Sequence, residues 1–302
     1  MSTTNKGTVG VIGLGIMGSA MAANLVKAGF EVIGTDILPE ACAAMKKAGG
    51  MPVASTQEVG KACRHIIISV ASVSALHQVC GELATSCARG TIVMETGTLP
   101  LADKQKARAL LGENGIILLD CTLSGTGAQA KTKDLAVYAS GEADAIKQLA
   151  PIIEGFARAC YDLGEFGNGT KMKFVANLLV AIHNVAAAEA ILLGVRSGLD
   201  PAMLVKVVGD GAGSSRMIQL RGPMMVKRAW DEPSVKSATN KLFLKDVKLI
   251  GEALQTAGCP APLFSACLPI YISANASGHS EHDPAAVYEI LERMALKPGG
   301  QK

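Results

Sequence analysis

The sequence has few charged residues and little excess of one sign. Of its 302 residues 18% are charged, and the formal net charge at pH 7 is only +3. Proteins that bind nucleic acid usually concentrate more positive charge, so this composition argues against a nucleic-acid partner. A small anionic ligand remains compatible with it. Because 49% of the residues are hydrophobic, the chain can bury a substantial core and is not of the disordered class.

Cysteine patterns typical of metal sites are also missing. The eight cysteines include no CxxC pair, and the closest pairs stand seven or eight residues apart. Persistent disulfides belong to oxidising compartments, so we expect reduced thiols in a cytoplasmic protein. The sequence therefore predicts neither a metal site nor a disulfide framework.

No targeting signal is evident in the sequence. The N-terminal residues run directly into an apolar strand pattern, without the separate charged and apolar regions of a secretory signal. Residues 174–195 could span a bilayer by length, but Asn177, His183, Asn184 and Glu189 interrupt them. We expect a buried helix there and no membrane partner.

Short apolar runs alternate with helical patterns in the first half of the chain. The expected strands cover residues 8–12, 31–36, 65–70, 91–96, 115–120, 134–140 and 157–163. Such alternation predicts a mostly parallel sheet with helices on both faces, here over residues 1–165. Residues 166–302 show only helical patterns, at 170–196, 200–210, 214–228, 235–257, 262–276 and 283–295, and a tail at 297–302 that should fray. The predicted architecture is an α/β domain joined by a long helix to an all-helical domain.

A glycine-rich motif follows the first expected strand. It reads Gly13-Leu14-Gly15-Ile16-Met17-Gly18 and opens a helix. Gly13 would permit the tight turn, Gly15 the approach of a pyrophosphate, and Gly18 close packing of helix on strand. The helix N-terminus would offer N–H groups to phosphate. The motif predicts a Rossmann-type dinucleotide site, with a purely structural turn as the alternative.

Asp36 closes the second expected strand, where a Rossmann domain meets the adenosine ribose. Its carboxylate can accept hydrogen bonds from the ribose hydroxyls and would repel a 2′-phosphate. Ile37 and Leu38 follow it and offer no arginine for such a phosphate. We therefore expect NAD rather than NADP as the cofactor. The alternative is that Asp36 only caps the helix beginning near Pro39.

Two further motifs contain polar groups suited to a substrate. Ser124-Gly125-Thr126 follows an apolar strand and could bind a carboxylate, although it could also be an ordinary turn. Lys173 and Asn177 lie one helical turn apart, whereas Lys171 meets only Val175 at that spacing. Lys173 is thus a candidate acid/base group, and a solvated lysine is the alternative. The helix face with residues 173, 177, 180 and 184 is expected to line a cleft between the domains.

Together the three motifs resemble the β-hydroxyacid dehydrogenase family. This family includes 3-hydroxyisobutyrate dehydrogenase and tartronate semialdehyde reductase, and it is related to 6-phosphogluconate dehydrogenase. The segments that carry the resemblance are 13–32, 124–130 and 167–177, with Thr98 and the pair Lys245-Asp246. The resemblance implies a Rossmann domain followed by a helical domain, and a homodimer or homotetramer.

The resemblance also implies an activity and a set of roles. The chain would be an NAD-dependent oxidoreductase of small anionic β-hydroxyacids or the matching semialdehydes. Lys173 would be the catalytic acid/base, with Asn177 beside it. The implied substrate site comprises Ser124, Gly125, Thr126 and Asp246. The implied cofactor site comprises the Gly13–Gly18 loop, Asp36, Val70, Ala71, Thr98 and Lys245.

The sequence departs from the family pattern in four places. Thr126 replaces a glycine, and Gly97 replaces the serine before Thr98. Residues 69–73 lack the proline usual after the fourth strand, and Ala176 replaces a histidine of the phosphogluconate enzymes. 6-Phosphogluconate is therefore not the expected substrate. Two other functions remain open: a non-catalytic nucleotide sensor or interaction protein on the same fold, and an imine or ketone reductase.

Overall fold

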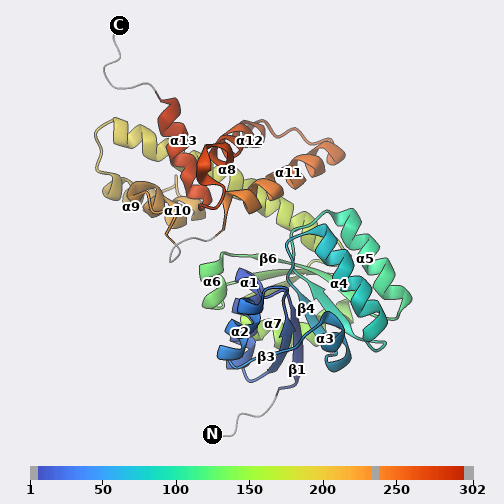
Figure 1. Ribbon diagram of the computed structural model, residues 1–302. Coiled ribbons are helices and arrows are strands. Elements are labelled where there is room, and N and C mark those ends of the chain that lie inside the picture. Colours follow the sequence, from blue (N-terminus) through green and yellow to red (C-terminus); the bar gives the residue numbers. More distant parts are fainter. Residues whose placement is uncertain (1–5, 233–237, 296–302) are drawn as a thin grey trace. The chain divides into compact units, whose positions relative to one another are not determined.

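The protein consists of two compact units that meet within one helix. The computed structural model describes residues 6–232 and 238–295, and its units are Met1–Lys173 and Phe174–Lys302 (Figure 1). The boundary expected after residue 165 precedes the long helix α8 (Asn168–Arg196), whereas the first unit includes the opening turns of that helix. This difference arises because the start of α8 is hydrogen-bonded to the sheet of the first unit.

An eight-stranded sheet forms the centre of the first unit. Its order is β3-β2-β1-β4-β5-β6-β7-β8, and all neighbours are parallel except the antiparallel pair β6 and β7. The strands are β1 (Thr8–Ile12), β2 (Glu31–Thr35), β3 (Met51–Pro52), β4 (His65–Ile68), β5 (Ile92–Glu95), β6 (Ile117–Ser124), β7 (Ala136–Ser140) and β8 (Ala159–Asp162). The predicted Rossmann-type, mostly parallel sheet is confirmed. The two-residue strand β3 was not predicted, because two residues are too few to show a strand pattern.

Helices cover both faces of this sheet (Figure 1). They are α1 (Ile16–Lys27), α2 (Pro39–Lys47), α3 (Thr56–Ala62), α4 (Val73–Ser86), α5 (Leu101–Glu113), α6 (Gly127–Lys131) and α7 (Ala143–Phe156). Alternating side chains of a strand belong to opposite faces. In β4, Ile67 packs in the core with α1 and α7, while Ile66 and Ile68 pack in the core with α3, α4 and α5. The continuous apolar strands of the sequence therefore reflect burial on both faces.

The loops of functional interest lie at one edge of the sheet. Strands β1, β4, β5 and β6 are consecutive and parallel, so their carboxyl ends point the same way. Ligands of open α/β sheets bind outside the carboxyl ends of the strands. The Gly13–Gly18 loop, Val70, Thr98 and Ser124 all follow or close these strands.

The second unit is helical throughout its described residues. After α8 come α9 (Pro201–Asp210), α10 (Arg216–Lys227), α11 (Asn240–Ala257) and α12 (Pro262–Ala274), then the π turn η1 (Asn275–His279), the 3-10 turn η2 (Pro284–Ala286) and α13 (Val287–Met294). Residues 235–237 of the helix expected at 235–257, and the tail at 297–302, lie outside the described residues. Helix α11 begins where the Thr239 side chain accepts a hydrogen bond from the Leu242 N–H.

Helix α8 is the central helix of the second core. By length and apolarity it could cross a membrane, but Ala181, Val185, Ala188 and Ile191 pack in that core. Asn184 is fully buried, and its Nδ2 donates to Tyr271 Oη at 3.1 Å and to the Pro284 carbonyl at 2.9 Å. The cleft-lining position expected for Asn184 is therefore wrong, because the helix face that carries Lys173 continues into a packed interior.

Candidate cofactor and catalytic site

The Gly13–Gly18 loop needs its glycines for different reasons. Gly13 has φ +88°, and a Cβ there would lie 2.3 Å from the Ser69 carbonyl oxygen. A Cβ on Gly18 would lie 1.9 Å from the Gly13 carbonyl oxygen, so helix α1 can pack on this loop only through glycine. Gly15 has no such neighbour, since no atom lies within 4 Å of its hypothetical Cβ. The protein leaves space beside Gly15 that its own fold does not require.

That space would be available to the pyrophosphate of a dinucleotide. Gly15 is the N-cap residue of α1, has an extended backbone and supplies no side-chain cap, and the first turn of α1 contains no acidic residue. The N-terminal N–H groups of a helix and its dipole favour a phosphate at such a position. Gly13–Gly18 would therefore hold the pyrophosphate.

Replacing Gly15 by alanine should weaken cofactor binding and leave folding intact. The added methyl group meets no protein atom within 4 Å, but it occupies the space proposed for the pyrophosphate. We expect the NADH dissociation constant to rise at least about tenfold, equivalent to about 1.4 kcal/mol. Fluorescence titration and the melting temperature would be measured together. Gly18→Ala is the contrast, because its clash with Gly13 should lower the melting temperature too.

Asp36 is held in place by two backbone N–H groups. Its Oδ2 accepts from Leu14 at 2.6 Å, and its Oδ1 accepts from Leu38 at 2.9 Å. The N-cap residue of α2 is Leu38, so Asp36 is not itself the cap of that helix. The carboxylate is instead fastened to the glycine-rich loop, where it can meet a ribose.

Removing the Asp36 charge should reduce the preference for NAD over NADP. Two unit charges about 4 Å apart interact by about 4 kcal/mol at an effective dielectric constant near 20, an upper figure at a solvated site. Half of that corresponds to more than about tenfold discrimination. We expect Asp36→Asn, which keeps an oxygen acceptor, to shrink the NAD/NADP ratio of kcat/KM. Equal efficiency with both cofactors in the unsubstituted protein would contradict this role.

The other expected cofactor residues of the first unit lie at strand ends. Val70 follows β4 and is half-buried, with its Cγ1 3.3 Å from the hypothetical Cβ of Gly13. Ala71 is exposed, and Thr98, in the loop after β5, is half-buried. Adjacent strands carry these loops, so the fold brings them to the edge that holds Gly13.

The Ser124–Thr126 loop leads directly into helix α6. Gly125 has φ +138°, and a Cβ there would lie 2.5 Å from Leu135 Cδ2. Thr126 caps α6: its Oγ1 accepts from the Gln129 N–H at 3.3 Å, and its own N–H donates to Gln129 Oε1 at 3.0 Å. The Thr126 N–H is thus engaged within the loop, while its hydroxyl accepts a bond there and still has its O–H to donate. Ser124 Oγ, the Gly125 N–H and Thr126 Oγ1 are then the donors to consider for a substrate carboxylate.

The start of α8 is anchored by side chains from the sheet. Gly167 has φ +99°, and a Cβ on Gly169 would lie 2.4 Å from the Tyr138 carbonyl oxygen. Ser140 Oγ accepts from the N–H groups of Gly167 at 3.2 Å and Gly169 at 3.0 Å. Asp120 Oδ2 accepts from the Thr170 N–H at 2.7 Å. These bonds satisfy N–H groups that have no partner within the helix.

Lys173 and Lys171 have different surroundings. Lys171 is exposed, and its Nζ donates to Asn168 Oδ1 at 3.1 Å. Lys173 is half-buried and lies three residues after the anchored Thr170. One turn further, Asn177 is buried. The helix phase expected for the two lysines agrees with this difference in exposure.

The second unit brings together three of the expected residues. Asn177 Nδ2 donates to Asp246 Oδ2 at 3.0 Å, and Lys245 Nζ lies 3.1 Å from Asp246 Oδ1. Asp246 therefore links the asparagine of α8 to the lysine of α11.

Both units match families of known dehydrogenases. The NAD-binding domain of 6-phosphogluconate dehydrogenase matches residues 8–164, and the NAD-binding domain of NADP-dependent 3-hydroxyisobutyrate dehydrogenase matches residues 167–291. The chain belongs to the β-hydroxyacid dehydrogenase family. As a member of it, this dehydrogenase is an NAD(P)-dependent oxidoreductase acting on hydroxyacids.

Curated relatives and solved structures of other proteins are similar to this chain along nearly its full length. L-threonate dehydrogenase of Cupriavidus necator is 32% identical over 96% of this chain and 98% of its own length. The crystal structure of 3-hydroxyisobutyrate dehydrogenase from Salmonella typhimurium has a TM-score of 0.85 at 30% identity, covering 94% of this chain and 99% of that one. The Mycobacterium tuberculosis 3-hydroxyisobutyrate dehydrogenase with L-serine has a TM-score of 0.84 at 25% identity, covering 94% and 98%.

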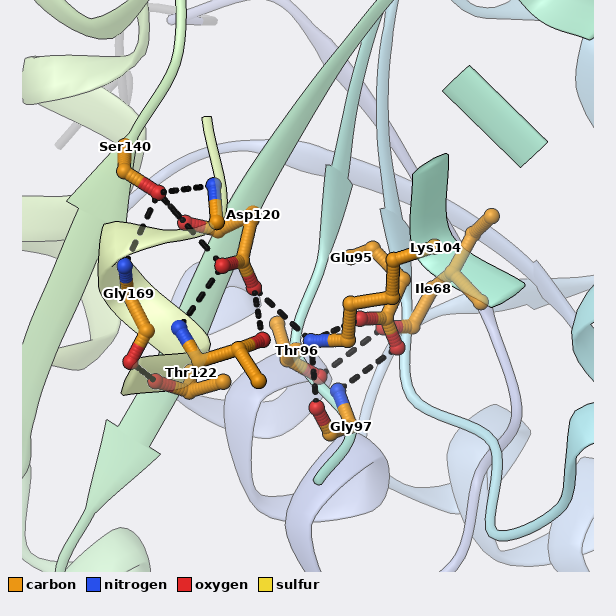
Figure 2. A network of polar contacts seen from close by, with 11 residues as sticks. Ile68, Glu95, Thr96, Gly97, Lys104, Asp120, Thr122, Ser140 and Gly169 are labelled. Carbon is orange, nitrogen blue, oxygen red and sulfur yellow. Dashed lines mark hydrogen bonds and ion pairs between the residues drawn. The ribbon is translucent and has the colours of Figure 1, made fainter. Parts of the chain in front are cut away.

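Sequence reasoning missed one polar cluster of this dehydrogenase. Lys104 on α5 is fully buried between the carboxylates of Glu95 and Asp120 (Figure 2). One signal in the sequence could have indicated it. Lys104 shares a helix face with Ala107 and Leu111, both fully buried, so a charged residue stands on an apolar face.

Proposed function

We propose that this dehydrogenase oxidises a small hydroxyacid with a hydroxyl on the carbon β to its carboxylate, or reduces the matching semialdehyde. NAD is the preferred cofactor, Lys173 the acid/base group, and Ser124 and Asn177 substrate ligands. The observation that carries the proposal is the place of Lys173, half-buried and one turn past a helix start that is anchored to the sheet. Asp36, fixed beside the glycine-rich loop, supports the choice of NAD.

Lys173 would transfer the proton that accompanies hydride transfer. A bound nicotinamide would supply or accept the hydride. In oxidation a neutral Lys173 amine takes the hydroxyl proton, and in reduction the ammonium returns it to the carbonyl oxygen. Ser124 and Asn177 would orient the substrate during this transfer.

L-threonate is the first substrate to test, because the relative with 32% identity bears that name. L-Serine and 3-hydroxyisobutyrate are tested next, because the names of two similar solved structures contain them. The experiment is an NAD-linked turnover screen of these acids, with neutral primary alcohols as controls. Turnover of the acids supports the proposal. Equal turnover of neutral alcohols would contradict a carboxylate site, and no turnover of any of these acids would contradict the proposed β-hydroxyacid substrate.

Ser124→Ala should affect substrate binding more than the chemical step. The loss of one hydrogen bond to a carboxylate that is present in both ground and transition states raises KM and leaves kcat nearly unchanged. A bond to a charged group is worth about 1.5–3 kcal/mol, so we expect KM to rise at least about tenfold. Steady-state kinetics on the best acid of the screen would measure this. An unchanged KM would remove Ser124 from the proposed substrate site.

Self-association through the helical unit completes the proposal. Large apolar side chains of this unit are exposed, among them Leu193 at 71%, Leu263 at 68% and Val207 at 59%. Exposed apolar groups of this kind favour a homodimer or homotetramer. Light scattering during gel filtration would measure the mass. A cytoplasmic location is proposed on the family resemblance.

A further inference from the structure

Two carboxylates and one lysine form a closed network inside the first unit. Glu95 and Asp120 are register partners on the parallel strands β5 and β6, so their side chains emerge next to each other. Lys104 reaches between them from α5, with Nζ 2.6 Å from Glu95 Oε2 and 2.8 Å from Asp120 Oδ1 (Figure 2). Its third acceptor is the Gly97 carbonyl oxygen at 2.7 Å. The ammonium therefore donates hydrogen bonds to Asp120 and Gly97 and forms a close ion pair with Glu95.

The electrostatics of the network keep Lys104 charged. Burial alone would lower the pKa of the Lys104 ammonium, but the attraction of Glu95 and Asp120 outweighs burial and raises that pKa. Burial raises the pKa of the Glu95 carboxyl against the attraction of Lys104. A fully buried lysine with a raised pKa does not release its proton near neutral pH, so Lys104 is not a second acid/base group. Its contacts with Glu95 and Asp120 therefore fix the positions of these side chains.

One end of the network holds the loop after β5. Glu95 Oε1 accepts from the Gly97 N–H at 2.7 Å, while Lys104 bonds the carbonyl of the same residue. A Cβ on Gly97 would lie 2.7 Å from Glu95 Oε1, so glycine at this position lets the Glu95 side chain fold back onto the loop. Both backbone polar groups of Gly97 are thereby fixed. Thr98, an expected cofactor residue, is the next residue in the chain.

The other end holds the first turn of α8. Asp120 Oδ1 accepts from Thr170 Oγ1 at 2.9 Å as well as from Lys104, and Oδ2 accepts from the Thr170 N–H at 2.7 Å. Ser140 Oγ adds a contact to Asp120 Oδ2 at 3.4 Å and bonds the N–H groups of Gly167 and Gly169. Lys173 follows one turn later on the same helix.

We propose that Glu95, Lys104 and Asp120 are positioning residues that couple the Gly97–Thr98 loop to the first turn of α8, and so set the place of Lys173. The inference rests on the proposed role of Lys173. The coupling follows from the shared ammonium. If one carboxylate moves, Lys104 Nζ moves with it, and the contact of Nζ with the other carboxylate changes. Misplacement of a reacting group by about 1 Å can cost about 100-fold in rate, so such a link affects catalysis without touching substrate.

Isosteric amides test the network with little change in shape. In Asp120→Asn the amide cannot accept from the Thr170 N–H and Lys104 at once, and in Glu95→Gln it cannot accept from both Lys104 and Gly97. We expect each variant to lower kcat at least about tenfold with KM and the NADH dissociation constant within about threefold. The double variant should lose less than the product of the single losses, because both substitutions break one coupled unit.

Thr91→Val is the matched control. Thr91 is fully buried at the amino end of the same sheet, next to β5, and its Oγ1 donates to the Ala88 carbonyl at 2.7 Å. This variant removes one buried hydrogen bond of the same sheet, worth about 1 kcal/mol, and should keep kcat within about twofold, since its lost bond is far from the carboxyl ends of the strands. If its kcat falls as much as in the amide variants, the network is only structural and the proposal is overturned.

Amide hydrogen exchange at residues 167–173, measured without substrate, separates this inference from the proposed function. Asp120→Asn should speed exchange there at least about tenfold, because a charge-assisted bond at the helix start is lost. Glu95→Gln should raise exchange in the same segment through Lys104, and Thr91→Val should not. Unchanged exchange in both amide variants, or strictly multiplicative losses of kcat, would overturn the coupling. If Lys173→Ala stays active the proposed function fails, whatever the exchange result.

Discussion

Replacing Lys173 by alanine should lower kcat at least about 100-fold, whereas NADH should bind as before. A general acid/base group contributes typically about 10²–10⁴-fold to the rate. Lys173 is half-buried one turn after the anchored start of α8. The glycine-rich loop that would hold the cofactor is residues 13–18 and does not include Lys173, so its replacement should not weaken cofactor binding. Steady-state kinetics and fluorescence titration of NADH would measure the two effects separately. Loss of cofactor binding equal to the loss of kcat would argue against an acid/base role.

Lys171→Ala is the matched control for this prediction. Lys171 lies two residues earlier on the same helix and is exposed, with its Nζ bonded to Asn168. Its replacement should change kcat by no more than a few-fold, since a solvated lysine transfers no proton to substrate. The kcat of Asn177→Ala should lie between those of the Lys171 and Lys173 variants, because an amide positions the substrate without exchanging its proton. An inactive Lys171 variant with an active Lys173 variant would reverse the assignment.

Asp283→Ala should destabilise the helical unit by about 3–5 kcal/mol, as the breaking of a buried ion pair typically does. Arg221 Nε donates to Asp283 Oδ1 at 2.9 Å, and the side chains are 6% and 0% exposed. The same oxygen accepts from the Ala285 N–H at 3.0 Å at the start of η2. Removing the carboxylate leaves the guanidinium charge in a buried environment and the turn without its cap.

Urea unfolding followed by tryptophan fluorescence would measure this loss. Trp230 is the only tryptophan of the sequence and is 5% exposed in the core of the helical unit, so it reports on that unit. Lys147→Ala is the control, because Lys147 and Asp144 form an exposed pair on α7 with side chains 75% and 91% exposed. Exposed ion pairs contribute little to stability, so Lys147→Ala should unfold at the same urea concentration as the unsubstituted protein. Equal midpoints for all three proteins would show that the buried pair is dispensable.

Predictions from local sequence were most accurate where a backbone requirement dictated the residue. Gly13 must adopt positive φ, and Gly18 must let α1 approach the loop, so the spacing alone indicated a phosphate-binding turn. Apolar runs such as residues 65–70 predicted buried parallel strands, because both faces of such strands are covered. The antiparallel direction of β7 was not predicted, since the apolar pattern of a strand is the same in either direction.

The sequence by itself determined the alternation of strands and helices in the first unit and the glycine-rich turn, and it supplied the prediction that Lys173 rather than Lys171 is the acid/base group. Each depends on neighbours within about one helical turn or one strand, where spacing fixes geometry. Only the tertiary structure decided the partners of Asp120, Lys104 and Asn184. The helix face that Lys104 shares with Ala107 and Leu111 indicates burial, but its partners come from elsewhere: β5 and β6 place two carboxylates against it. Asn184 reads as a cleft residue until Tyr271 and Pro284, distant in sequence, enclose it. Burial and charge pairing arise from contacts between residues that are distant in sequence. The free energy of placing a polar side chain in the interior depends on these contacts more than on its neighbours in the chain.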